Sequence, residues 1–272
     1  MSLLAQRRAR GRGSVALLAV GALMTFQALA VVGTPSALAI ASCTFSGGTL
    51  SIVLSSGKSI VFSQNASGAI LVNGANTTAA PCSTTRATVT NTTAISVSGL
   101  TGDEDVSIKM DVTGAGTTIV SWGTLNWMIN LASGTGDSVT IDGAALTTDD
   151  LDIVLGASGI DLNHDDNLEV TLAAVEDVFV DGGDGDDTIW AAGSTATGAA
   201  FTVSLTATGG DGDEGGDGRD TFQGGAANDT LRGNAGNDTL KGAAGNDRLN
   251  GGPGGDICKG GPGADSVTMC ER

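Results

Sequence analysis

The strongest constraint on the fold of this chain is a nine-residue period that runs from residue 215 to residue 268. In units of nine, the segment is GGDGRDTFQ, GGAANDTLR, GNAGNDTLK, GAAGNDRLN, GGPGGDICK and GGPGADSVT. Position one is Gly and position six is Asp in all six units, and position four is Gly in five, with Ala227 the exception. A flexible Gly/Asp linker would hold no such register, so the period predicts a solenoid of stacked units.

The two halves of each unit have different roles. The Gly-rich half must turn sharply, and only glycine enters positive φ without a steric penalty. The second half is a short strand with one apolar side chain, which is buried only when the units stack. Stacking also gathers Asp side chains and turn carbonyls into an oxygen-only site, which suits Ca²⁺ better than Mg²⁺ or a soft metal.

The candidate metal-site residues are therefore the repeated acids and the glycines that open each unit. An earlier unit, GGDGDDTIW at 182–190, adds one more acid at position six. The set is Asp187, Asp220, Asp229, Asp238, Asp247, Asp256 and Asp265, with Gly215, Gly224, Gly233, Gly242, Gly251 and Gly260.

This pattern resembles the RTX, or hemolysin-type, calcium-binding repeat GGxGxDxUx. The resemblance implies a parallel β-roll in which two units make one turn and calcium lies between loops two units apart. Carried onto this sequence, about four full sites follow. Their acid pairs are Asp220 with Asp238, Asp238 with Asp256, Asp229 with Asp247, and Asp247 with Asp265.

Three residues depart from the repeat pattern. Asn234 and Ala243 replace Gly at position two, and Ala227 replaces it at position four, so we expect strained turns or weaker calcium sites there. The segment GGDGDE at 209–214 has the loop half without the strand half, and we expect it to form a cap at the start of the roll.

Composition and charge exclude several other classes. Glycine makes up 43 of 272 residues, which excludes a helical bundle because glycine is poor in helix interiors. Four prolines are too few for collagen. A formal charge of −17 excludes a nucleic-acid binder, which needs a basic surface.

Residues 1–39 have the three-part layout of a secretory signal peptide. Four arginines precede an apolar run at 14–32, and Ala37-Leu38-Ala39 offers a cleavage site, with a second after Ala41. We expect Sec-type export to the extracellular space and no membrane contact after cleavage, with surface association or an uncleaved anchor as the alternatives.

Cleavage after residue 39 removes four arginines and no acid, so the remaining chain has a formal charge of −21. Its first carboxylate is Asp103, and residues 40–102 are almost uncharged. A charge of this size repels itself in a compact state, and bound cations are the expected counter-charge.

The four cysteines are Cys43, Cys82, Cys258 and Cys270. An even count in a secreted chain favours disulfides, with three possible connectivities. We favour Cys43–Cys82 and Cys258–Cys270, which would staple each end of the mature chain. Ile40-Ala41-Ser42-Cys43 also resembles a lipobox, but acylation of Cys43 would leave Cys82 unpaired.

The fold class that we expect is all-β, a parallel β-roll or β-helix solenoid with a β-rich amino-terminal cap or module. The expected divisions are a signal peptide (1–39), a Ser/Thr-rich module or cap (40–100), a β-solenoid region (101–208) and the calcium-binding roll (209–272). Apolar or alternating runs predict strands at 49–55, 59–63, 69–73, 87–90, 94–98, 106–110, 138–141, 151–155, 168–172 and 175–180.

Other patterns in the sequence are weak. Asp161, Asn163 and Asp165 mimic the start of an EF-hand loop, but the turn Gly and the twelfth-position Glu are missing, so we expect a surface turn with incidental calcium affinity. His164 is interpreted as a solvated surface residue. Trp122, Trp127 and Trp190 are interpreted as packing residues rather than a sugar platform.

The predicted function is a secreted, non-catalytic calcium-binding protein. An enzyme is the first alternative: the single His excludes H-E-x-x-H, and G-x-S-x-G is absent, but paired carboxylates among Asp149, Asp150, Asp152, Asp161, Asp165 and Asp166 leave a polysaccharide lyase or hydrolase open. A second alternative is a surface adhesin that recognises cell-surface or matrix glycans.

Overall fold

Short strands account for all the regular structure in the described part of this computed structural model. The described residues are 40–65, 68–72, 75–76, 87–113, 125–132, 134–143, 151–183, 185–209 and 218–271. They form strands β1 to β21 and no helix, so no helix among them could cross a membrane. The predicted signal peptide, Cys82, Trp122 and Gly215 lie outside these residues.

The strands form two sheets, which we call sheet A and sheet B. In order across the sheet, sheet A contains β1 (Ile40–Ser46), β2 (Thr49–Leu54), β6 (Ala94–Ser98), β8 (Asn126–Asn130), β12 (Val170–Ala173), β11 (Gly159–Asp161), β10 (Asp152–Gly156), β14 (Thr188–Trp190), β16 (Thr221–Gln223), β18 (Thr239–Lys241) and β20 (Ile257–Lys259). Sheet B contains β21 (Ser266–Thr268), β19 (Arg248–Asn250), β17 (Thr230–Arg232), β15 (Ser204–Thr208), β13 (Asp177–Asp181), β9 (Ser138–Asp142), β7 (Asp105–Thr113), β3 (Ser59–Asn65), β4 (Ile70–Val72) and β5 (Ala75–Asn76).

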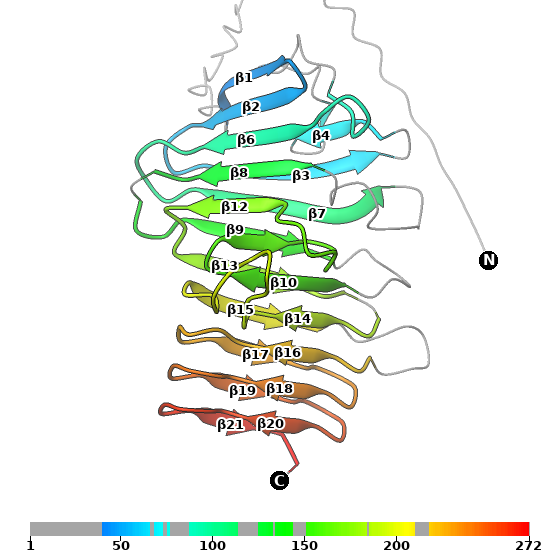
Figure 1. Cartoon of the computed structure of the whole chain (residues 1–272), viewed down its shortest axis with the longest axis vertical. Helices are drawn as coiled ribbons and strands as arrows, with labels where there is room; N and C mark the ends of the chain where they lie inside the picture. The colour runs from blue at the N-terminus through cyan, green and yellow to red at the C-terminus, as the bar shows by residue number, and fades with distance from the viewer. Residues whose placement is uncertain are drawn as a thin grey trace, which may run out of the picture. The chain divides into compact units, whose positions relative to one another are not determined.

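The nonapeptides stack with two units in each turn. β16, β18 and β20 pair in parallel in sheet A, and β17, β19 and β21 do so in sheet B (Figure 1). The register places Phe222 beside Leu240 and Leu231 beside Leu249, 18 residues apart. This arrangement confirms the predicted all-β, parallel β-roll.

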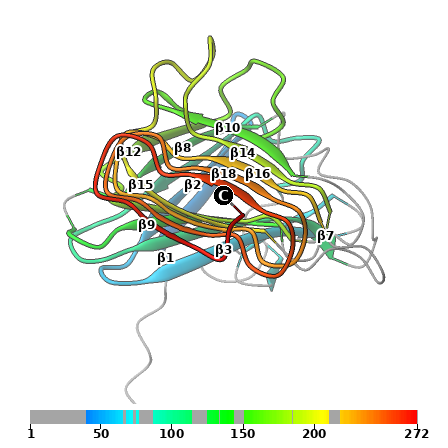
Figure 2. The ribbon, with the colours of Figure 1, turned by 90° about the horizontal axis from the view of Figure 1, so that it is seen from below.

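The core lies between the two sheets, which face each other in a view along the stack (Figure 2). The middle side chains of the nonapeptide strands form this part of the core. Phe222, Leu231, Leu240 and Leu249 are fully buried, whereas Val267 of the last strand, β21, is 45% exposed. Towards the amino terminus the strands are longer, and alternate residues point inward, as in the pattern of β6.

Two of the tryptophans lie within the described residues. Trp127 is fully buried and packs edge-to-face on Phe62, with ring centroids 5.0 Å apart, as a core residue would. Trp190 lies half-buried on β14, beneath the ammonium group of Lys241 at 5.8 Å.

Nine of the ten predicted strand segments overlap an observed strand. The prediction for 87–90 was wrong: these residues make a turn with one isolated bridge, from Thr88 to Ala69. Backbone hydrogen bonds join the Ile70 N–H to the Ala87 carbonyl and the Val89 N–H to the Gly68 carbonyl. The Thr88 N–H donates instead to the Asn91 side chain at 2.7 Å, so the pairing does not extend into a strand.

The strands of residues 40–100 belong to the same two sheets as the repeats. β2 pairs in parallel with β6, and β3 pairs in parallel with β7. The chain forms one compact unit from Ala37 to Arg272, and the other unit, Met1–Ser36, lies outside the described residues. The functional divisions at residues 100 and 208 stay predictions.

A disulfide closes the carboxyl-terminal turn. Cys258 of β20 is bonded to Cys270, as predicted, with their Cα atoms 5.8 Å apart. Cys258 pairs in register with Leu240 and packs against the core, so it takes the inward apolar position of its unit. Cys43 is buried and disulfide-bonded; Cys82, its predicted partner, lies outside the described residues.

Replacing one inward leucine tests the stacked core. We expect Leu240→Ala to lower the free energy of unfolding by about 2–5 kcal/mol, because the side chain is fully buried between neighbouring turns. The control is Met128→Ala on β8, where the side chain is 49% exposed and the change should stay within about 0.5 kcal/mol. Denaturant unfolding in saturating calcium measures both, and equal effects would contradict the register.

Candidate metal centre

The repeated aspartates form two ladders, one along each edge of the roll. In the sheet A ladder, an acid immediately precedes each of β14, β16, β18 and β20; in the sheet B ladder, an acid immediately precedes each of β17, β19 and β21. The sheet A ladder is Asp187, Asp220, Asp238 and Asp256, and the sheet B ladder is Asp229, Asp247 and Asp265. Parallel pairing therefore brings together all four acid pairs expected from the sequence.

One carboxylate oxygen of each acid is held by the backbone of the previous turn. The N–H of Asp220 donates to Asp238 Oδ1 and that of Asp229 to Asp247 Oδ1, each at 2.9 Å. The same bond joins the other successive acids of each ladder, at 2.9 to 3.0 Å. Sequence analysis missed this structural role, although the invariant position of the acid before each strand signals it.

The second carboxylate oxygen has no such partner at four positions. Among the described residues, Oδ2 of Asp220, Asp238, Asp247 and Asp256 is buried and accepts no hydrogen bond. Their side chains are at most 1% exposed. An ionised oxygen buried in this way is costly unless a charge compensates it, and a hard cation is the matching partner.

The first glycine of each unit is required for space. A Cβ on Gly233 would overlap Asp238 Oδ2 and lie 2.6 Å from the Gly251 carbonyl oxygen. A carboxylate oxygen and a carbonyl oxygen thus face the same small volume, and the same contacts recur at Gly224, Gly242 and Gly251. Gly260 meets its own acid in the same way.

The positive φ that we expected in the Gly-rich half of each unit occurs at positions two and four of the loop, not at position one. Gly252 at position two and Gly254 at position four have φ of 108° and 150°, whereas the glycines described at position one do not enter this region. Asn234 and Ala243, which replace Gly at position two, both have φ of 74°, so the expected strain is present there. Ala227 at position four does not adopt a positive φ.

Burial raises the pKa of several ladder acids. Desolvation raises the pKa of Asp220 to about 7, with the neighbouring carboxylates of Asp187 and Asp238 adding to the effect. Burial likewise raises the pKa of Asp229 to about 6. The pKa values of Asp238 and Asp247 are also raised, first by burial and then by the next acid of the ladder. Without a cation, Asp220 is therefore partly protonated near neutral pH, and the other acids bind protons more readily than a free aspartate does.

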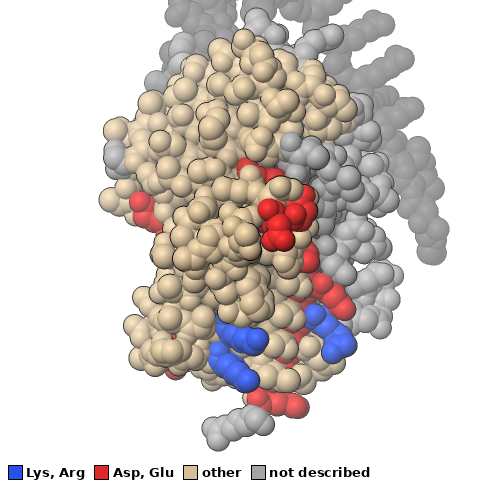
Figure 3. Space-filling view, in the orientation of Figure 1, with Lys and Arg blue, Asp and Glu red and all other residues tan. Residues whose placement is uncertain are grey.

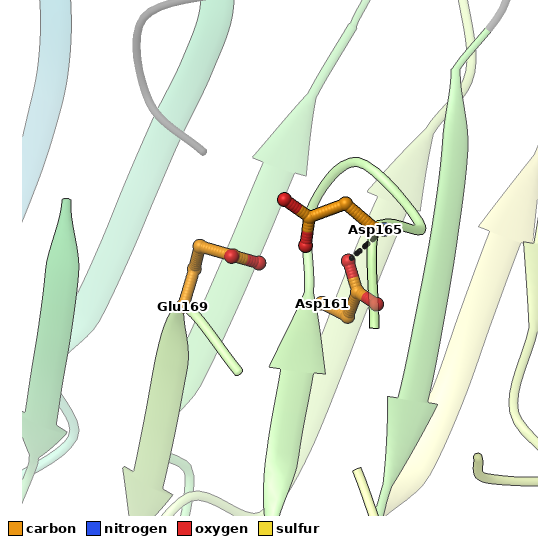
Figure 4. Close-up of side chains that lie close together, drawn as sticks. All are labelled: Asp161, Asp165 and Glu169. Atoms are coloured by element: carbon orange, nitrogen blue, oxygen red, sulfur yellow. Dashed lines mark hydrogen bonds between the residues drawn. The ribbon is translucent and has the colours of Figure 1, made fainter. Parts of the chain in front are cut away.

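A separate acidic cluster lies in the turn between β11 and β12 (Figure 4). Oxygen atoms of Asp161, Asp165 and Glu169 lie within 4.8 Å of one another, so the cluster could hold a metal. Burial raises the pKa of Glu169 to about 7. Strands rather than helices flank this turn, which excludes an EF-hand. We expected a surface turn, but the Asp161 side chain is buried. Its carboxylate oxygens accept hydrogen bonds from three backbone N–H groups of the turn.

The only histidine lies in this turn. His164 Nδ1 is 2.9 Å from Asp152 Oδ1, and its side chain is 45% exposed, in agreement with its interpretation as a surface residue.

The charged side chains visible in Figure 3 lie over the middle and carboxyl-terminal turns, whereas the face over the amino-terminal strands is almost uncharged.

Gly242→Ala tests the need for space at position one. The added Cβ would lie 2.5 Å from the Gly260 carbonyl oxygen and would overlap Asp247 Oδ2. We expect a loss of about 1–3 kcal/mol in the free energy of unfolding and weaker calcium binding. Ala244→Ser, at the exposed third position of the same loop, is the control; similar losses in both variants would contradict the packing argument.

The raised pKa values predict how stability depends on pH in chelator. Between about pH 4 and pH 7 the folded state binds more protons than the unfolded chain, so stability falls as pH rises through the folded pKa values. Chemical unfolding in EDTA should therefore give lower stability at pH 8 than at pH 5, and Asp220→Asn should reduce the difference. If the variant shows the same loss of stability from pH 5 to pH 8 as the wild type, Asp220 is not the cause of that loss.

Comparison with known proteins agrees with this geometry. The model of the RTX calcium-binding nonapeptide repeat matches residues 176–194, 214–249 and 232–267, in four copies. No curated protein and no solved structure matches the chain. The matched residues include both acid ladders and the described glycines that open the nonapeptides, Gly224, Gly233, Gly242, Gly251 and Gly260. The carboxyl-terminal turns of this solenoid are RTX calcium-binding nonapeptide repeats.

Proposed function

We propose that this is a secreted, non-catalytic protein whose β-roll binds calcium outside the cell and depends on it for folding. The observation that carries the proposal is the set of buried Oδ2 atoms in the ladders, at Asp220, Asp238, Asp247 and Asp256. Each faces a turn in which carbonyl oxygens are close, so the donor set is entirely oxygen, as Ca²⁺ prefers.

Calcium acts on folding through these acids. Without it, closing the turns buries carboxylates beside one another at a cost in desolvation and repulsion. An ion that binds the folded state alone lowers this cost and stabilises the fold by mass action. An affinity of roughly 10⁻⁴–10⁻³ M, usual for extracellular modules, would keep the roll unfolded in the cytosol and fold it after export.

Export is supported by two features of the chain. Residues 1–39 carry the charge and hydropathy pattern of a signal peptide. The Cys258–Cys270 disulfide is of a kind that persists in oxidising compartments. Cell-surface and matrix glycans remain the expected class of partner if the solenoid also serves in adhesion.

The non-catalytic role rests on the sequence motifs. The histidine pair of the metalloprotease motif and the serine motif of the lipases are both absent from the sequence. The acid cluster that left a polysaccharide enzyme open includes Asp161, whose carboxylate is bonded to backbone N–H groups of its own turn.

Far-UV circular dichroism of the chain from Ile40 to Arg272 tests the proposal. Added Ca²⁺ should produce a β-sheet signal that the same concentration of Mg²⁺ does not. Asp247→Asn should move the midpoint to higher calcium, whereas Asp103→Asn, which removes one exposed charge outside the repeats, should not. A full β signal in chelator that calcium leaves unchanged would refute the folding role.

A further inference from the structure

A turn outside the matched repeats has the spacing of their loop half. Residues 99–104 read GLTGDE, with Gly99, Gly102 and Glu104 at the places of Gly, Gly and Asp in the nonapeptide. The turn joins β6 of sheet A to β7 of sheet B, as residues 224–229 join β16 to β17. It is therefore the topological equivalent of a calcium-binding turn, with Glu in place of Asp.

The contacts of the two turns also correspond. A Cβ on Gly99 would lie 2.6 Å from Glu104 Oε2 and 2.7 Å from the Leu131 carbonyl oxygen. A Cβ on Gly224 would lie 2.5 Å from Asp229 Oδ2 and overlap the Gly242 carbonyl oxygen. In both places a glycine leaves room for a carboxylate oxygen of its own turn and a carbonyl oxygen of the next turn.

The next turn also contributes the same backbone bond. The Glu104 N–H donates to Asp137 Oδ1 at 2.7 Å, as the Asp229 N–H donates to Asp247 Oδ1 at 2.9 Å. Asp137 Oδ2 accepts from the Gly134 N–H at 3.1 Å, and both acids are fully buried. Asp137 is thus a positioning residue that fixes the backbone of Glu104.

One oxygen of Glu104 lacks a partner. Oε1 accepts a hydrogen bond from the Gly57 N–H at 2.8 Å. Oε2 is buried and accepts none among the described residues, and neither ion pair found among them includes Glu104. A buried carboxylate oxygen without a donor is the same signal that marks the acid ladders of the repeats.

We propose that the turn 99–104 and the neighbouring residues of the next turn, Leu131 and Asp137, form a calcium site, with Glu104 Oε2 and the Leu131 carbonyl among its ligands. This site lies outside the nonapeptides and between other strands, so it does not depend on the repeats binding calcium. The bound ion would compensate the negative charge of Glu104 and Asp137, which are buried in the amino-terminal half of the stack.

The number of calcium ions bound by the full chain tests this site. Equilibrium dialysis with elemental analysis should give one calcium fewer for Glu104→Gln than for the wild type. Asp152→Asn removes the same charge from an exposed side chain of β10, outside both turns, and should keep the wild-type number. Glu104→Asp places in this turn the acid that the repeats use, and this variant should also bind the wild-type number of calcium ions. An unchanged number in Glu104→Gln overturns the proposal.

Thermal unfolding separates a calcium ligand from a structural residue. In chelator Glu104→Gln should be at least as stable as the wild type, because its amide can donate to the Leu131 carbonyl. In calcium it should gain less than the wild type. Equal destabilisation in both conditions would assign Glu104 a structural role and overturn the proposal. Asp247→Asn, measured in parallel, reports on the repeat sites alone, so failure there would count against the proposed function instead.

Discussion

The rest of this structure depends on the parallel stacking of the position-six aspartate of one turn on the position-six aspartate of the next turn. Each stacked acid gives one oxygen to a backbone N–H of the previous turn, as Asp238 does to Asp220. At Asp220, Asp238, Asp247 and Asp256 the other oxygen is left buried beside carbonyl groups, without a donor among the described residues. Strand pairing therefore creates a need for counter-charge, because the register that forms the sheet also buries the carboxylates beside one another.

The glycines and the core follow from the same stacking. A side chain at Gly233 would occupy the space in which carboxylate and carbonyl oxygens meet, so a close approach selects glycine there. The short strands β16 to β19 bury one side chain each, and a unit such as 221–223 has no core until its neighbours are in place. Residues 99–104 show that this design continues where the nine-residue period is no longer visible.

The sequence predicted the roll and the acid pairs because a fixed period specifies both neighbours and register. It did not predict β15, whose Ser204–Thr208 segment is rich in hydroxyl residues, or β8, since each depends on flanking strands rather than on its own pattern. The equivalence of Glu104 to the repeat acids was also missed, because the turn that follows has a different length and sequence. Only the strand register reveals that Gly99 lies beside Leu131.

The most direct test of this account is the free energy of unfolding of Asp238→Asn with and without calcium. In chelator the variant should be more stable than the wild type, because it removes a buried charge, and in saturating calcium it should be less stable. Asp103→Asn should follow the wild type in both conditions. A variant that is less stable than the wild type by the same amount in chelator and in calcium would show that Asp238 serves the backbone alone, and would contradict the account.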